Sequence, residues 1–338
     1  MPPQRITDQA EWARVMERAA PVLSQIGQLL VSHSAGKPKH GYKRGIDFYS
    51  ASSLPVIVTN DINQFFGAHD RLPNLMGSPL LSDKIFASKY FRAFKIPETG
   101  NKLLTSSFIP DDARDLVSCA EIVWHSPKAR IPRSGEVGPG VYYLKTNHGA
   151  NMYRRVTYPM SEAEAQALDR EFAANLKNAY GLNFGEWWYN AFAPELLLER
   201  AVGSDELTTS WNFYVVGGEI GLIVVYQKIG GPTEFRKSYF TRDFAPLDEA
   251  TPTAAQTALP SKKARTRMVD AALAIGRGLG FVRVDFLLDD DEQPFLGEVT
   301  FCPGSGINRL SPDLDARLGS MWPVLSEPMV VRQQLWDD

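Results

Sequence analysis

The feature that most constrains this chain is a pair of alternating segments, FVRVDFLL (281–288) and PFLGEVTF (294–301), separated by the polar residues DDDEQ. Such segments around a short polar turn predict a β-hairpin, in which successive side chains point to opposite faces. A turn centred between Asp291 and Glu292 sets the register. One face then contains only apolar residues and glycine, paired as Val282 with Phe301, Val284 with Val299, Phe286 with Gly297 and Leu288 with Phe295. We expect this face to belong to a hydrophobic core.

The opposite face of the predicted hairpin pairs Arg283 with Thr300, Asp285 with Glu298 and Leu287 with Leu296. Two carboxylates directly across a ladder repel each other. A divalent cation would remove the conflict, and Mg²⁺ is usually held by one or two carboxylates together with nucleotide phosphates. The alternative is an ion pair of Arg283 with Asp285 or Glu298 on a solvated face. We favour the metal site, because both strands, the register and the following CPGSG loop (302–306) agree with it.

The rest of the chain predicts an α+β organisation. Its 338 residues suffice for two or three packed lobes. Gly217-Gly218 joins two strand-like runs and is a strong hairpin signal. Ser161 and Glu164 form a capping-box pattern that opens a helix. Further helices are expected over residues 9–32 with a kink at Pro21, over 83–94 and from Ser261, and residues 227–260, rich in Gly, Pro and Thr, are expected to form a mobile loop.

Charge and hydropathy exclude several classes of protein. The net charge is −3 and the pI is near 6.0, whereas a nucleic-acid-binding domain is expected to be strongly basic. The longest apolar run, IGLIVVY (220–226), is far shorter than the roughly 20 residues of a membrane span. The N-terminus lacks the apolar segment of a signal peptide, and Cys119 and Cys302 have no metal-type spacing. We therefore expect a cytoplasmic protein without a nucleic-acid partner.

Three motifs occur in a characteristic order: YLKTNHG (143–149), LLLERAV (196–202) and VRVDFLL…FLGEVTFCPGSG (282–306), followed by LSP at 310–312. Together they resemble the ATP-grasp superfamily, and within it the TupA-like family linked to teichuronopeptide and other surface-polysaccharide biosynthesis. The resemblance runs from about Leu81 to Leu318. It implies an ATP-grasp fold in which two α+β lobes, a central one at 81–205 and a C-terminal one at 206–338, clasp ATP. An N-terminal helix and loop-rich region at 1–80 would lie on the substrate side.

The resemblance implies a site for ATP and Mg²⁺, with Mn²⁺ as an alternative cation. Lys84 and Lys145 match the two lysines that hold ATP phosphates, although each taken alone reads as a surface lysine. The remaining positions implied by the resemblance are Glu199 facing the adenine amino group, the Ala201–Val202 backbone reading the base edge, Asp285 and Glu298 as metal-binding carboxylates, and Thr300 where many relatives place an asparagine ligand.

The same resemblance implies catalytic residues. Arg283 matches the arginine that stabilises the acyl phosphate and the tetrahedral intermediate, and Arg236 with Lys237 resembles a basic pair that reaches the transferred phosphate. A solvated charge cluster is an equally favoured alternative for that pair. The chain departs from its relatives in two places: NHGANMYRR (147–155) has fewer glycines than their phosphate-covering loop, and Ser210 and Asn212 replace an acidic and a basic residue, which leaves ribose recognition to a substitute such as Glu206.

The function implied by the resemblance is an ATP-dependent ligase that forms an amide through an acyl phosphate. The partners would be a small-molecule or glycan carboxylate and the amine of an amino acid or amino sugar, in polysaccharide, cell-surface or secondary-metabolite biosynthesis. Alternatives are an ATP-grasp kinase, a non-catalytic nucleotide-binding protein, or a glycan-binding protein suggested by Trp187 and Trp188, for which packing is the commoner role. The CPGSG loop is the expected substrate-binding loop, and His148 is expected to support loop geometry. The sequence predicts no particular oligomeric state.

Overall fold

The computed structural model describes residues 9–33, 40–204, 209–229, 234–249 and 257–322. The chain divides into two compact units, each assembled from segments that are separate in sequence. Of the described residues, the first unit comprises 9–33, 40–94, 181–187 and 302–322, and the second comprises 95–180, 188–204, 209–229, 234–249 and 257–301. The three sequential regions expected from the sequence stay a prediction.

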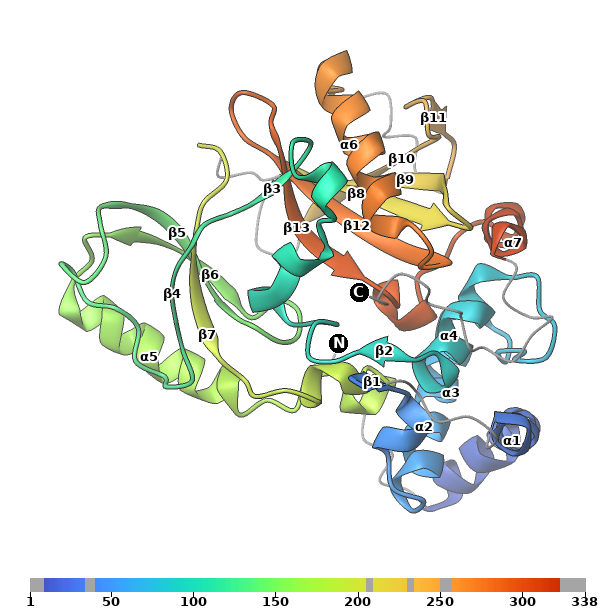
Figure 1. Ribbon diagram of the computed structural model, residues 1–338. Helices are drawn as coiled ribbons and strands as arrows, with labels where there is room; N and C mark the ends of the chain where they lie inside the picture. The colour runs from blue at the N-terminus through green and yellow to red at the C-terminus, as the bar shows by residue number, and fades with distance from the viewer. Residues whose placement is uncertain (1–8, 34–39, 205–208, 230–233, 250–256, 323–338) are drawn as a thin grey trace. The chain divides into compact units, whose positions relative to one another are not determined.

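A seven-stranded sheet with the order β11-β10-β9-β8-β12-β13-β3 forms one half of the second unit (Figure 1). All its pairings are antiparallel except the one between β13 and β3. Gly217 and Gly218 connect β8 and β9 with positive φ angles of 59° and 85°, which confirms the predicted hairpin. The strands are β3 (Ser118–Cys119), β8 (Thr209–Val216), β9 (Glu219–Lys228), β10 (Phe235–Phe240), β11 (Pro246–Leu247), β12 (Phe281–Leu288) and β13 (Pro294–Thr300).

Helix α6 (Lys262–Gly276) covers one face of this sheet and packs on β8, β9 and β12 (Figure 1). Ser261 begins the helix, as expected, because its hydroxyl accepts a hydrogen bond from the Ala264 N–H. The helix and sheet approach closely: a Cβ placed on Gly276 would lie 2.6 Å from a methyl group of Val215. Val282, Val284 and Phe286 of β12 are all fully buried. The apolar face of the predicted hairpin therefore belongs to the core from Val282 to Phe286, whereas Leu288, Phe295 and Gly297 are not buried.

The hairpin register was predicted correctly only as far as Asp285. Arg283 faces Thr300, Val284 faces Val299 and Asp285 faces Glu298, but the register then shifts by one residue. The predicted pairs beyond that point are wrong, because the observed ones are Phe286 with Leu296, Leu287 with Phe295 and Leu288 with Pro294. The cause lies in the turn, where the Asp289 carboxylate accepts hydrogen bonds from the N–H groups of Asp291 and Gln293. This Asx-type closure moves the turn centre, and Gly297 absorbs the difference as a bulge.

The expectation of a loop over 227–260 was wrong for the residues that form strands. Strand β9 continues to Lys228, and β10 and β11 extend the sheet. The segment FRKSYF alternates between exposed and buried positions, with Ser238 and Phe240 buried. The Gly, Pro and Thr content of 227–260 favours a loop, but the alternation within residues 235–240 is the primary signal of a strand. Residues 230–233 and 250–256 lie outside the described residues.

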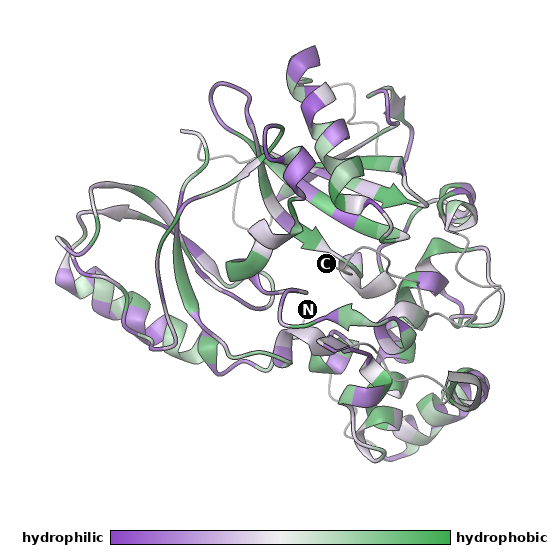
Figure 2. Ribbon diagram, viewed as in Figure 1, coloured by the Kyte–Doolittle hydropathy of each residue, from purple (hydrophilic) through white to green (hydrophobic). Residues whose placement is uncertain are grey.

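A four-stranded antiparallel sheet with the order β4-β7-β5-β6 forms the other half of the second unit. Its strands are β4 (Ile122–Ser126), β5 (Gly140–Thr146), β6 (Tyr153–Tyr158) and β7 (Leu196–Arg200). Helix α5 (Glu162–Leu176) packs on it through Ala165 and Phe172, both fully buried, and Figure 2 shows the helix alternating between hydrophilic and hydrophobic residues. The Ser161 hydroxyl accepts from the Glu164 N–H, which confirms the predicted helix start.

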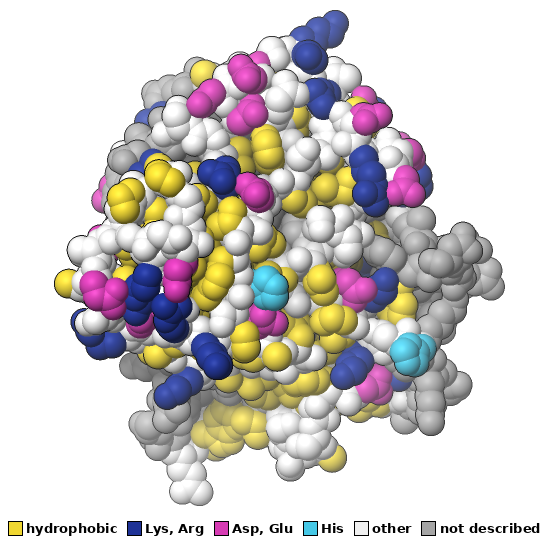
Figure 3. All heavy atoms as spheres, turned by 60° about the vertical axis from the view of Figure 1, so that its left-hand side comes forward, with side chains coloured by type: hydrophobic (Ala, Val, Ile, Leu, Met, Phe, Trp, Pro, Cys, Tyr) yellow, Lys and Arg dark blue, Asp and Glu magenta, His cyan; other side chains and the backbone are white. Residues whose placement is uncertain are grey.

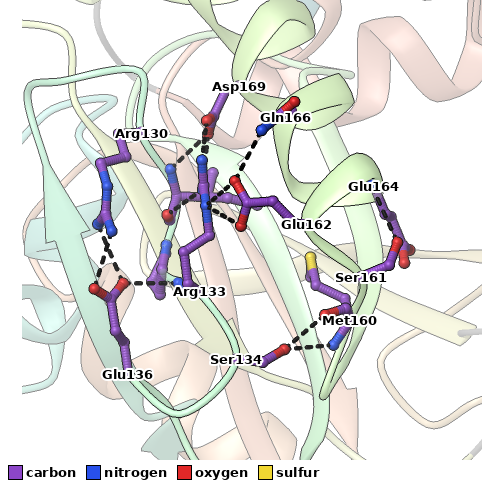
Figure 4. Close-up of polar contacts among 12 residues, drawn as sticks. Arg130, Arg133, Ser134, Glu136, Met160, Ser161, Glu162, Glu164, Gln166 and Asp169 are labelled. Atoms are coloured by element: carbon purple, nitrogen blue, oxygen red, sulfur yellow. Dashed lines mark hydrogen bonds and ion pairs between the residues drawn. The ribbon is translucent and has the colours of Figure 1, made fainter.

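The segment 127–139 is tied to α5 by a network of ion pairs (Figure 4). The Arg133 guanidinium lies 2.6 Å from Asp169 and 3.1 Å from Glu162. Arg130 and Glu136 form a second pair within the segment at 3.0 Å. Several charges that share partners hold a loop more firmly than isolated surface pairs do. On the face drawn in Figure 3, basic and acidic side chains likewise lie near one another, beside areas of hydrophobic and uncharged atoms.

The first unit is mainly helical. Ala19, Val22, Val58, Phe65 and Phe86 form the centre of its core. Helix α1 passes through Pro21 as one uninterrupted element, and every residue of α4 is buried. Its elements are α1 (Gln9–His33), β1 (Tyr42–Lys43), α2 (Gly45–Phe48), α3 (Ser53–His69), α4 (Leu81–Phe91), β2 (Phe94–Lys95, at the unit boundary), η3 (Leu182–Phe184), η6 (Pro303–Gly306) and α7 (Pro312–Met321). Short helices in the second unit are η1 (Lys102–Phe108), η2 (Asp111–Ala113) and, from the boundary residue Trp187, η4 (Trp187–Asn190). In the described part of the chain, no helix has both the length and the apolarity to span a bilayer.

Candidate active site

A cavity of about 310 Å³ lies within the second unit, and we call it the central cavity. Its volume is at the lower end of the range for small-molecule sites. Segments of both sheets and of η1 line it. The lining residues are Lys102, Tyr143, Lys145, Gly149, Ala150, Asn151, Met152, Tyr153, Glu199, Val202, Ser210, Asp285, Leu287, Gly297 and Glu298. Aromatic and aliphatic side chains thus share one cavity with two lysines and three carboxylates.

The polar face of the β12–β13 hairpin forms one wall of this cavity. Asp285 and Glu298 are paired across the ladder, as predicted. Arg283 binds both oxygens of Asp285, with Nε 2.7 Å from Oδ1 and Nη2 2.5 Å from Oδ2, and lies 3.9 Å from Glu298. It also donates to the Thr300 hydroxyl at 3.2 Å. The ion pair considered as the alternative is therefore present; the side chain of Asp285 is only 10% exposed, whereas that of Glu298 is 34% exposed.

The ionised form of the Asp285 carboxyl group is disfavoured by its surroundings. Burial raises its pKa, Arg283 opposes this rise and Glu298 adds to it, and the result is about 6. A neighbouring cation would favour the ionised form. Among the described residues, no group of three or more His, Cys, Asp or Glu side chains is arranged so that it could hold a metal ion by itself. Two carboxylates without further protein ligands fit Mg²⁺, which completes its shell with phosphates and water.

Two lysines, Lys102 and Lys145, also line the cavity. Lys145 of β5 forms a 2.6 Å ion pair with Glu199 of β7, on strands that are direct neighbours. Lys102 of η1 donates from Nζ to the Gly149 carbonyl. Burial lowers the pKa of Lys102; Glu298 and Glu199 raise it, and Lys145 lowers it further. Sequence reasoning missed Lys102, whose only local signal is the capping residue Asn101 before it.

Lys84, predicted as a phosphate ligand, is not among the described residues that line the cavity. It belongs to the first unit and donates to the carbonyl oxygens of Gly319 at 2.7 Å and Trp322 at 2.6 Å. These carbonyls lie at the C-terminal end of α7, where a cation stabilises a helix. The contacts of Lys84 favour a structural role, and its assignment to phosphate stays a prediction.

Arg236 and Lys237, predicted as a basic pair, lie on opposite faces of the seven-stranded sheet. The face of Asp285 continues through Asn212 and Val224 to Tyr239 on β10. Lys237 shares this face, with its ammonium 5.2 Å from the ring centre of Tyr226. Arg236 points to the other face, because adjacent residues of a strand alternate. Neither residue lines the cavity in the described part of the chain, so a joint role is not supported by their placement.

The predicted base-binding segment is close to the cavity. Val202 lines it, whereas the Ala201 N–H donates to the Val141 carbonyl at 3.0 Å. Glu199 is held by Lys145 and is not a free strand-terminal carboxylate. Ser210 also lines the cavity and donates to the Asn212 side-chain oxygen at 2.5 Å. Glu206 lies outside the described residues, and its predicted contact with ribose stays a prediction.

The loop 147–152 between β5 and β6 is shaped by side chains as well as by glycine. Its backbone is tied by the Asn147 side-chain oxygen, which accepts from the Glu195 N–H at 2.8 Å. His148 is buried, with Nε2 3.1 Å from the Asn178 carbonyl, and burial lowers its pKa. At Gly149 (φ 72°) a Cβ would lie 2.7 Å from the Tyr180 ring, so only glycine fits. These contacts agree with a supporting role for His148.

Trp187 and Trp188 are both almost fully buried, at 0% and 3% exposure. A sugar-binding platform needs an exposed ring, so the packing role expected for this pair fits their placement and the glycan-binding alternative loses its main support. The two sheets, the paired carboxylates and the cavity lysines together describe an α+β protein of the ATP-grasp class. Comparison with known families agrees with this description.

The family described as TupA-like ATPgrasp matches residues 144–322, just over half of the chain. This protein belongs to the TupA-like ATP-grasp family. A D-alanine–D-alanine ligase from Anaeromyxobacter sp. (strain Fw109-5) is 34% identical over 119 residues, which cover 34% of this chain and 38% of that ligase. The chain therefore matches well under half the length of that relative.

Solved structures of two ligases also resemble the chain. The D-alanine–D-alanine ligase from Bacillus anthracis in complex with ATP has a TM-score of 0.40 and 15% identity, covering 72% of this chain and 66% of that chain. The L-amino acid ligase from Bacillus licheniformis has a TM-score of 0.37 and 15% identity, covering 62% and 42%. The family assignment rests on the family match and not on these structures.

Proposed function

We propose that this protein is an ATP- and Mg²⁺-dependent ligase that joins a carboxylate to an amine. The observation on which the proposal depends is the facing of Asp285 and Glu298 across the β12–β13 ladder at the wall of a cavity that also holds two lysines. Such an arrangement of carboxylates is unfavourable without a cation and favourable with one. The D-alanine–D-alanine ligase that matches part of the chain supports the reaction class.

In this proposal the carboxylate substrate attacks the γ-phosphorus of ATP. The bond between that phosphorus and the bridging oxygen breaks, ADP leaves, and an acyl phosphate forms. The amine nitrogen then attacks the acyl carbon, loses a proton and displaces inorganic phosphate, which leaves an amide. Both steps move negative charge between oxygens, so positioning and charge neutralisation are the main contributions of the protein.

The residues of the cavity have distinct roles in this scheme. Asp285 and Glu298 would hold Mg²⁺, with the Thr300 hydroxyl nearby, and Mn²⁺ could replace it; the cation would neutralise charge on the phosphates. Lys145 would bind phosphate once its pairing with Glu199 opens. Arg283, fixed by two hydrogen bonds to Asp285, presents a rigid planar cation to the developing oxyanion. Val202 and Leu287 would contact the base, with Glu199 beside the adenine amino group.

The substrates proposed are a small-molecule or glycan carboxylate and an amino acid or amino sugar. The setting proposed is polysaccharide or cell-surface biosynthesis, as the sequence resemblance implies, with secondary-metabolite assembly as a further setting. The CPGSG loop is proposed to contact one of these substrates. A kinase on the same scaffold would stop after phosphoryl transfer and release a stable phosphorylated product.

The test is a screen of ADP release from ATP and Mg²⁺ with pairs of carboxylates and amines, followed by mass spectrometry of the products. For any active pair, the carboxylate is labelled with ¹⁸O. Acyl-phosphate chemistry transfers one labelled oxygen to inorganic phosphate and yields an amide. A phosphorylated product without an amide supports the kinase, and ADP release that persists fully in Asp285→Asn contradicts the metal assignment.

A further inference from the structure

The position of Lys102 in the second unit is fixed from several sides. Its N–H donates to the Asn147 carbonyl at 2.9 Å, and its carbonyl accepts from the Thr105 hydroxyl at 3.1 Å. Gly100 (φ 80°) precedes it in a turn where a Cβ would lie 2.6 Å from the Trp188 ring, so the turn is packed against that side chain. A residue outside any strand is thereby held in a defined place beside the loop 147–152.

The side chain of Lys102 reaches into the central cavity. Its ammonium donates to the carbonyl of Gly149, itself a lining residue of the loop. Lys102 and Glu298 also both line a small neighbouring cavity, which places this lysine on the metal-carboxylate side of the site. A lysine has three donors, and the Gly149 carbonyl is a neutral acceptor for one of them, while Glu298 and Glu199 act on its charge without a direct hydrogen bond in the described structure. The second lysine of the cavity, Lys145, is neutralised by Glu199 at 2.6 Å.

Lys84 has the opposite surroundings. Two backbone carbonyls at 2.6–2.7 Å hold its ammonium at the end of α7, and the residue is buried. Both bonds hold the ammonium at the helix end, and Lys84 is not among the described residues that line the central cavity. Lys102 thus lines a cavity that a ligand can enter, whereas the contacts of Lys84 are with the end of a helix.

We propose that Lys102, and not Lys84, is the lysine that binds the phosphates of the nucleotide together with Lys145. The inference rests on the proposed function for the presence of ATP in the cavity. The Gly149 carbonyl orients the ammonium in the absence of ligand, and a phosphate oxygen of greater charge replaces or joins that acceptor when the nucleotide binds. Because Lys102 and Gly149 are bonded, the phosphate-covering loop would be positioned by the same residue, which offsets its low glycine content.

The test compares the affinities of purified variants for ATP, ADP and adenosine by isothermal titration calorimetry, with and without Mg²⁺. Lys102→Met keeps the length and the backbone bonds and removes the charge. We expect it to weaken ATP binding about 10- to 100-fold, the usual range for loss of a hydrogen bond to a charged group, and to leave adenosine binding unchanged. Lys102→Arg should keep most of the ATP affinity. Lys84→Met should lower the melting temperature and keep the preference for ATP over adenosine.

Lys177→Met is the matched control, because Lys177 is exposed at the end of α5 and should change neither affinity. The inference is overturned if Lys102→Met binds ATP like the wild type, if it loses ATP and adenosine equally, or if Lys84→Met is the variant with the selective loss. This experiment distinguishes a failure of the Lys102 assignment from a failure of the proposed ligase function. If the wild type binds ATP through Lys102 but makes no amide, only the ligase assignment is contradicted. If the wild type binds no ATP, both the ligase assignment and the role of Lys102 are contradicted.

Discussion

Two buried clusters of charge, one in each unit, contain the same kinds of groups but satisfy them differently. In the first unit Lys89 lies 2.5 Å from Asp61, and both side chains are at most 1% exposed. Tyr90 donates to the same carboxylate at 2.7 Å, and Lys89 donates to the carbonyls of Ser305 at 2.9 Å and Phe184 at 3.1 Å. One anion and one cation are thus matched, and neutral groups complete their hydrogen bonds.

In the second unit the cluster is unbalanced. Asp285 and Glu298 face each other, and Arg283 satisfies Asp285 while it remains 3.9 Å from Glu298. A cavity adjoins both carboxylates. The difference shows that burial of charge does not by itself indicate function. A cluster whose charges are all matched holds the fold together, whereas a cluster with an excess anion beside a cavity has the capacity to take up a cation.

Removing one member of the matched cluster should have the largest effect on stability. Lys89→Met leaves the Asp61 carboxylate buried without a cation, which is expected to cost about 3–5 kcal/mol. Urea unfolding, with hydrogen exchange of α3 and α4 to assign the loss to the first unit, measures this. The double variant Lys89→Met/Asp61→Leu removes both charges and should recover much of the loss. A single-variant cost below about 1 kcal/mol would show that the cluster does not hold the first unit together.

The unbalanced cluster should respond in the opposite manner. Glu298→Gln removes a charge that lies 3.9 Å from Arg283 and should change unfolding little, whereas Asp285→Asn also removes the close ion-pair partner of Arg283 and should lower stability. Turnover with ATP should fall about 10²- to 10³-fold or more, the size associated with loss of one preorganised electrostatic group. ADP release at several Mg²⁺ concentrations measures it. Marked unfolding of these variants with turnover retained would place this cluster in the structural class as well.

The features that depend on neighbouring residues in the sequence were predicted correctly. Because side chains alternate along both strands, the facing of Asp285 and Glu298 followed from residue order alone, and the Gly217-Gly218 hairpin and the Ser161 and Ser261 helix starts did too. The bulge at Gly297 did not, because it depends on how the Asp289 side chain closes the turn. The exact pairing past Asp285 is decided by side-chain hydrogen bonds that a residue pattern does not contain.

Tertiary contacts explain the remaining differences. Lys102 belongs to a short irregular helix with no period, and only packing of Gly100 against Trp188 and bonding to residues 147–149 bring it to the cavity. Arg236 and Lys237 were grouped because they are adjacent, yet adjacency in a strand sends them to opposite faces. The grouping would have been avoided had the alternation of β10 been given more weight than its composition.

Acid should favour opening of the loop 147–152, with an opening equilibrium constant that rises about tenfold per pH unit between the lowered pKa of His148 and 6.5. Burial lowers the pKa of His148 from its ordinary value of 6.5, so between the two values the open loop binds a proton that the closed loop does not. Stability of the closed loop is therefore present above 6.5 and decreases as the pH falls. Hydrogen exchange of residues 147–152 between pH 7.5 and 5 measures this. His148→Gln keeps a donor towards Asn178 without titrating, and its exchange should lack the excess pH dependence; equal slopes would exclude His148 as the cause.

The smallest effect is expected where the base-binding segment meets the hairpin turn. Asp290 accepts hydrogen bonds from the N–H of Ser204 at 2.9 Å and from its hydroxyl at 3.0 Å, and both residues are exposed. Gly203 lies between Ser204 and Val202 with φ 72°, so these bonds fix the exit of the segment that lines the cavity. Exposed hydrogen bonds contribute at the low end of their range, and Asp290→Ala should therefore raise the KM for ATP only about two- to threefold without changing kcat. Asp291→Ala removes the same charge one residue away and should leave KM unchanged. If both variants raise KM equally, charge near the cavity and not the clamp on Ser204 is responsible, because only Asp290 bonds to that segment.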